Sequence, residues 1–169
     1  MAWLGQRAAT LGFDPRRVVV SGHSAGGHLA ALLSAMPPAA VLGQPVLAAV
    51  PVSGVFALVP LLLTSVNHDV RMSPQDALRL SPAACPRFHA GAFLVAVGGS
   101  ETEGFIGQSR DFVRAAVAAG TPAELMVVPQ RTHFDVLEDL ARPGHALFQQ
   151  VLRLFGDSTP PRCSSGANA

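Results

Sequence analysis

The chain has 169 residues, which is enough for one domain with a hydrophobic core and too few for two ordinary domains. Charged residues make up only 14% of it, every basic residue is arginine, and the net charge is +1. No block of like charge occurs, so neither nucleic acid nor a membrane surface is indicated as a partner. Apolar residues reach 49%, which argues against disorder over most of the length.

The expected elements alternate along the chain. Four short apolar runs predict buried strands, over 17–21, 46–52, 92–97 and 124–128. Apolar residues at helical spacing predict helices over 3–11, 28–36, 105–119 and 134–155, the last interrupted at Pro143-Gly144. Such alternation indicates an α/β fold with a parallel sheet covered by helices on both faces. Ligands of such sheets bind beyond the carboxyl ends of the strands.

Compartment and termini are read from weaker signals. Cys85 and Cys163 lie far apart, which suggests neither a disulfide framework nor a metal site and favours a reducing cytoplasm. The first residues do not read as a signal peptide. Three prolines interrupt the apolar stretch 45–63, so we interpret it as a strand and turn rather than a membrane span. Residues 156–169 are polar and small, and we expect a disordered tail there.

The turn after the first strand carries the clearest chemical signal. Gly22-His23-Ser24-Ala25-Gly26 is a G-x-S-x-G motif with a strand before it and a helix after it. Ser24 is therefore the candidate nucleophile, and the backbone N–H of Ala25 is the candidate oxyanion donor. We expect both flanking glycines to be needed because a side chain there would clash. The structural alternative is a glycine-rich turn in which Ser24 only caps the helix.

A serine nucleophile needs a base, and the base needs an acid to orient it. His133 follows the fourth strand in a short loop before a helix, at the sheet edge where Ser24 lies. Glu101 and Glu103 follow the third strand, and either could reach the imidazole. The alternative for both glutamates is favourable charge at a helix N-terminus.

Four segments resemble a known family: 18–30, 53–67, 98–109 and 132–135. They are similar to the α/β-hydrolases and, within them, to the kynurenine formamidase (arylformamidase) group and its esterase relatives. Phe105 with Gln108-Ser109, and the His133-Phe134-Asp135 loop, are the more particular matches. The resemblance implies the α/β-hydrolase fold over 1–155 with only its C-terminal four strands present. It assigns Ser24 as nucleophile, His133 as base and Glu101, in preference to Glu103, as acid.

The chain departs from this family in two places. Ala57 stands where relatives commonly have aspartate, and no His-Gly-Gly motif precedes Ser24 to supply the second oxyanion N–H. We therefore expect that the N-terminal portion of the hydrolase domain is lacking and that the first strand is left uncovered at an edge. Expressed alone, the chain should be poorly soluble and nearly inactive, since losing one oxyanion donor already costs about 10²–10³ in kcat.

The resemblance implies a serine hydrolase that cleaves a formamide or an ester. In the arylformamidase case it converts N-formylkynurenine to kynurenine and formate in tryptophan breakdown, with no metal or organic cofactor. A small-molecule substrate is the expected partner, a homodimer stays open, and the expected location is cytoplasmic. One alternative is a general carboxylesterase of the same fold. The alternative of another class is a truncated non-catalytic fragment or pseudoenzyme.

Overall fold

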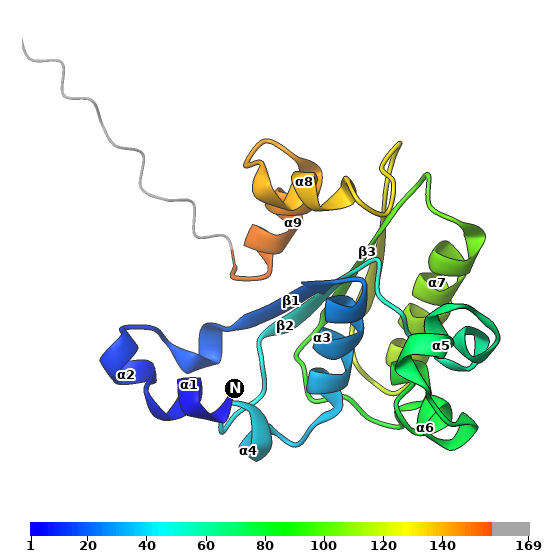
Figure 1. Ribbon diagram of the computed structural model, residues 1–169. Helices are drawn as coiled ribbons and strands as arrows, with labels where there is room; N and C mark the ends of the chain where they lie inside the picture. The colour runs from blue at the N-terminus through cyan, green and yellow to red at the C-terminus, as the bar shows by residue number, and fades with distance from the viewer. Residues whose placement is uncertain (157–169) are drawn as a thin grey trace, which may run out of the picture.

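A computed structural model describes residues 1–156, and its elements follow the predicted alternation (Figure 1). The strands are β1 (Val19–His23), β2 (Ala48–Val52), β3 (Phe93–Gly98) and β4 (Ala123–Val128). They form one parallel sheet in the order β1-β2-β3-β4. All four carboxyl ends therefore lie at one edge of the sheet. The predicted tail, including Cys163, lies outside the described residues except for Gly156.

Helices cover both faces of this sheet. On one face, α3 (Ala25–Ala35) packs on β1 and β2, and α7 (Glu103–Ala118) packs on β3 and β4. On the other face lie α8 (Val136–Ala141) and α9 (Ala146–Arg153) (Figure 1). Shorter helices fill the connections: α1 (Ala2–Gln6), α2 (Ala8–Leu11), α4 (Pro38–Val41), α5 (Val66–Val70) and α6 (Pro74–Arg79). This confirms the predicted α/β class.

The two faces bury two separate cores because side chains alternate along each strand. Toward α3 and α7 point Ala49, Phe93 and Val95, which join a cluster that contains Ala31 and Phe112. The opposite cluster consists of Val50, Val52, Leu94, Ala96, Val128, Val136 and Leu147. Every residue of β2 and β3 is buried, as expected for central parallel strands.

The two outer strands are more exposed than the central ones. β1 pairs only with β2 among the described residues, and every residue of it is at least partly exposed. An apolar groove runs beside it, lined in part by Val20, Leu29 and Leu33. Leu29 is 63% exposed. β1 is thus an edge strand with apolar neighbours, as the sequence predicted.

Some element boundaries differ from the predictions. The N-terminal helix breaks at Arg7 into α1 and α2. The weak helix former Gly5 lies just before this break, and its backbone packs so closely on Leu42 that a Cβ would lie 2.5 Å from the carbonyl oxygen. The last helix is interrupted between α8 and α9, as predicted. We did not predict α5 and α6, although Ser73, which caps α6 through the Asp76 N–H, and Pro74 at its first position are a start signal.

None of the described helices has the length and apolar character needed to cross a membrane.

Candidate active site

Ser24 alone forms the turn between β1 and α3. β1 ends at His23 and α3 begins at Ala25, so the turn is shorter than the predicted 22–27. The backbone of Ser24 has φ 55° and ψ −115°, a strained conformation for a residue with a side chain. Its N–H donates to the carbonyl of Val52 over 2.9 Å, which ties the turn to the next strand. Ala25 opens α3, so its backbone N–H has no acceptor within the helix.

The glycines around Ser24 are not equivalent. A Cβ on Gly22 would lie 2.2 Å from the carbonyl oxygen of Gly26, and one on Gly27 would lie 2.9 Å from Gly54 Cα. A Cβ on Gly26 would meet nothing within 4 Å. The expectation that both flanking glycines are sterically required is therefore right for Gly22 and wrong for Gly26. Gly26 faces the groove beside β1, while the close approach to β2 falls on Gly27.

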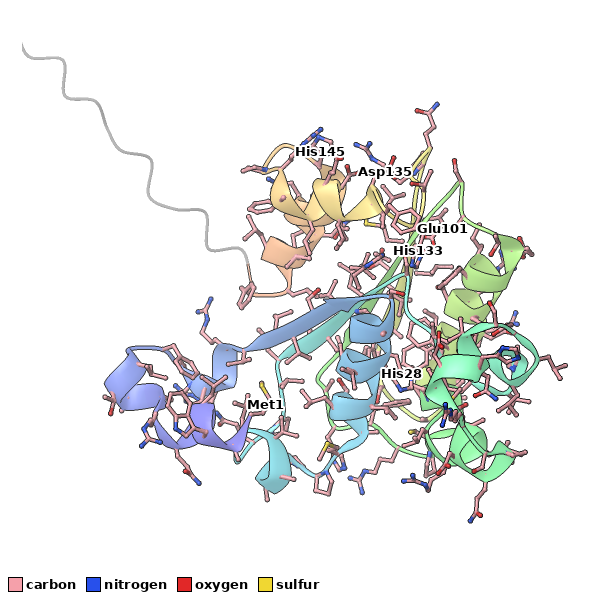
Figure 2. All side chains as sticks on the ribbon, viewed as in Figure 1. Met1, His28, Glu101, His133, Asp135 and His145 are labelled. Carbon is pink, nitrogen blue, oxygen red and sulfur yellow. The ribbon has the colours of Figure 1, made fainter. Side chains whose placement is uncertain are left out.

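His133 and Glu101 meet at the carboxyl edge of the sheet (Figure 2). The imidazole Nδ1 lies 2.7 Å from Glu101 Oε2, and the Glu101 side chain is fully buried. Glu103, the alternative acid, is 78% exposed and pairs with Arg110 instead. The structure therefore brings Glu101, and not Glu103, to the predicted base.

The other oxygen of Glu101 is held by two donors. Oε1 accepts hydrogen bonds from Ser53 Oγ over 2.5 Å and from the Gly98 backbone N–H over 2.7 Å. Ser53 follows β2, and Gly98 ends β3. The acid is thus fixed by the ends of two neighbouring strands.

The His133 ring lies between His23 and Phe105. Its centroid is 4.6 Å from that of His23 and 4.5 Å from that of Phe105. His23 Nε2 donates to the backbone carbonyl of His133 over 2.7 Å. Because His23 directly precedes Ser24, this contact brings the loop of the base to the nucleophile turn. Among the described residues no hydrogen bond joins Ser24 Oγ to His133, a contact that often tightens only when substrate binds.

Polar contacts hold the loop that carries His133, one set within the loop and one from the residue that precedes it. Thr132 donates to Asp135 through its backbone N–H and its hydroxyl. These hydrogen bonds, led by that of the Thr132 side chain, lower the pKa of Asp135 below its ordinary value. Before the loop, Arg131 pairs with Asp139 of α8, and the hydrogen bond to Asp139 raises the pKa of Arg131.

An apolar pocket of about 440 Å³ opens beside Ser24. Its walls include Leu58, Leu61, Val66, Met72 and Phe105. Besides Ser24, the polar side chain in the lining is His28, whose Nδ1 donates to the Val55 carbonyl over 2.9 Å. Figure 2 shows His28 on α3, on the side that faces α5. The pocket suits an uncharged, apolar group next to the nucleophile.

The segment that follows β2 is attached to α7 through its backbone. Gln108 Oε1 accepts hydrogen bonds from the N–H groups of Phe56 and Ala57, over 2.9 and 2.8 Å. Because Ala57 contributes its N–H to this contact, the alanine that departs from the family pattern leaves it intact.

A family model described as the alpha/beta hydrolase fold matches residues 1–136. This chain belongs to that family. Kynurenine formamidase of Salmo salar is 33% identical over 144 residues, which cover 81% of this chain and 49% of the salmon protein. Kynurenine formamidase of Danio rerio is 32% identical over 149 residues, with the same coverage of 81% and 49%. This α/β-hydrolase chain thus spans about half the length of both relatives.

Solved structures show the same similarity. A protein of Silicibacter sp. TM1040, proposed to be a thioesterase, has a TM-score of 0.72 and is 34% identical, over 84% of this chain and 52% of its own. Esterase 2 of Thermogutta terrifontis has a TM-score of 0.66 and is 27% identical, over 90% of this chain and 58% of its own. The fold of this α/β-hydrolase chain is therefore shared with esterases.

Two residues at the site of this α/β-hydrolase chain were missed in the sequence. In the sequence, Ser53 ends a strand and opens a segment similar to the family, and His23 is the variable position of the motif, but neither pattern predicts a role for the side chain. Both act across strand ends, where residues far apart in sequence meet. The short Ser53-Gly54 turn at the carboxyl edge of the sheet was the one signal that could have pointed to Ser53.

Proposed function

We propose that this chain carries the nucleophile, base and acid of a serine hydrolase that cleaves a formamide or an ester, with arylformamidase activity foremost. The observation that carries this proposal is the pair of buried Glu101 and partly exposed His133, whose ring contacts His23, the residue before the strained Ser24. The similarity to two kynurenine formamidases supports the formamide substrate.

In the proposed reaction Ser24 Oγ attacks the carbonyl carbon while His133 takes the hydroxyl proton. Glu101 holds the imidazole through Nδ1 and stabilises the cation that forms. The Ala25 N–H at the start of α3 donates to the oxyanion. The carbon–nitrogen bond then breaks, and the leaving amine takes the proton from His133. A water molecule, deprotonated by His133, attacks the formyl ester, and formate leaves as Ser24 regains its proton.

The pocket supports an aryl or another apolar group on the substrate. N-formylkynurenine, whose hydrolysis gives kynurenine and formate in tryptophan breakdown, carries an aromatic formamide of this kind. A general carboxylesterase is the second candidate, favoured by the similarity to Thermogutta esterase 2 and by a lining without charged side chains. We further propose a small-molecule partner, with no cofactor, and a cytoplasmic location.

Because turnover by the 169-residue chain alone should be slow, the test is covalent labelling by a fluorophosphonate, which needs only one reaction per molecule, followed by intact-mass spectrometry. We expect one adduct, which S24A abolishes and S100A, an exposed serine at the same edge, leaves unchanged. Hydrolysis of N-formylkynurenine and p-nitrophenyl acetate, measured on a full-length form, then separates the two candidates. Turnover confined to the ester would remove the formamidase. Equal labelling of wild type and S24A, with no turnover, would identify a non-catalytic fragment.

A further inference from the structure

Ser53 occupies an unusual position at the end of β2. It is fully buried, and its backbone has φ 48°, in the left-handed region that favours glycine. Its N–H donates to the Ala96 carbonyl of β3 over 2.7 Å. A glycine would adopt this conformation without strain, so the side chain is kept at a position that disfavours side chains. Strained residues of this kind concentrate at functional sites.

Among residues 1–156, the hydroxyl of Ser53 has one hydrogen-bond partner, the carboxylate of Glu101. Other buried serines behave differently, because Ser34 and Ser109 each donate to the carbonyl four residues earlier in their own helix. The Ser53 hydroxyl instead reaches from the end of β2 to the turn after β3. The preceding residue, Val52, accepts the Ser24 N–H, so this short segment contacts both the nucleophile turn and the acid.

The contact decides which way the carboxylate faces. The last torsion of a glutamate side chain is soft and roughly two-fold, so the carboxylate alone has no strong preference for its orientation. With Ser53 Oγ and the Gly98 N–H both on Oε1, the other oxygen is left to accept the His133 Nδ1–H. We propose that Ser53 is a positioning residue that orients Glu101 toward His133, a role that rests on the proposed function.

The kinetic test compares S53A with wild type. Losing a hydrogen bond to a charged group should slow Ser24 labelling and ester turnover about 10- to 100-fold, in kcat rather than KM, because Ser53 touches the acid and not the pocket. S34A, which removes another buried serine hydroxyl far from the acid, should leave the rate unchanged. A wild-type rate in S53A would overturn the proposal.

Two further variants separate positioning from a structural role. In an E101A background, S53A should cause no further loss of the labelling or turnover rate. If S53A instead slows the enzyme by the same factor in both backgrounds, Ser53 does not act through Glu101. S53G also lacks the hydroxyl but relaxes the backbone. Its labelling and turnover rates should be as low as those of S53A, and its Tm should be at least as high. Recovery of the wild-type rate in S53G would refute the role of the hydroxyl.

A measurement that does not depend on turnover can test the role of Ser53 separately from the proposed hydrolase activity. The proton that His133 Nδ1 donates to Glu101 should give a low-field ¹H NMR resonance, assigned by its loss in E101Q. S53A and S53G should shift or broaden it, while S34A should not. Unchanged spectra in both Ser53 variants would overturn the positioning role. If Ser24 is not labelled but the resonance still depends on Ser53, the proposed function is contradicted and the positioning role of Ser53 is supported.

Discussion

Two buried carboxylates in this chain each bind a histidine Nδ1. Glu101 Oε2 lies 2.7 Å from His133, and Asp139 Oδ1 lies 2.8 Å from His145. Both carboxylates are nearly inaccessible, with exposed side-chain fractions of 0% and 8%. Distance and burial alone therefore do not distinguish the two pairs, although Figure 2 shows His145 apart from His133 and Glu101.

Their other partners distinguish them. Glu101 is held by neutral donors from two strand ends, and the His133 ring contacts His23, the neighbour of Ser24. Asp139 pairs instead with Arg131, so its charge is neutralised by a cation, and His145 lies where α9 begins. The second pair therefore links α8 to the start of α9, and Arg131 ties both to the loop that follows β4. A carboxylate–histidine pair is a candidate for catalysis only where a nucleophile and an open pocket lie next to it.

The comparison is tested most strongly by removing each histidine. H133A should reduce Ser24-dependent ester turnover and labelling to the level of S24A, since loss of the base in a serine hydrolase costs about 10⁶-fold in kcat. H145A should keep the rate within a few-fold of wild type. Rates are measured with p-nitrophenyl acetate and the fluorophosphonate. Comparable losses in both variants would mean that His133 has no special role.

Substituting each carboxylate separates activity from stability. E101Q should lower kcat about 10⁴-fold, because the amide no longer fixes the imidazole in the productive orientation. D139N should leave the rate nearly unchanged but lower Tm by roughly 3–10 °C, because Arg131 and His145 lose their charged acceptor. Activity and thermal melts are measured on the same samples. A large rate loss in D139N would place the second pair in the mechanism.

A smaller effect is expected at Asp135, in the loop that carries His133. Thr132 lowers the pKa of Asp135 from its ordinary value of 3.8, so the ionised carboxylate stabilises the fold above that pH. This stabilisation should be lost as the pH falls below 3.8 through the lowered value. The Tm difference between wild type and D135N should therefore shrink as the pH falls through this range. E124Q, which removes an exposed carboxylate of β4, serves as the control. A difference that grows toward acid pH would contradict the assignment.

Much of the site could be predicted because it depends on local patterns. The β-branched run before Gly22-His23-Ser24 predicts a strand and a sharp turn, and the positions of Glu101 and His133 after later strands predict one common sheet edge. The short helices α5 and α6 were not predicted because they are brief and depend on caps and tertiary packing rather than on long periodicity. The steric need for glycine was assigned wrongly to Gly26 because the motif does not show which side of the turn faces β2.

The sequence by itself determined the alternation of apolar strands and helices, the nucleophile turn, and a short set of candidate acids and bases, since all of these follow from local propensity and spacing. At 169 residues it read as one ordinary domain, yet the chain spans only about half of its formamidase relatives. Only the tertiary structure joined Ser53 to the acid, placed the His23 ring against His133, and put the close approach to β2 at Gly27 rather than Gly26. These outcomes depend on which strand ends meet, and sheet register brings together residues that are distant in sequence.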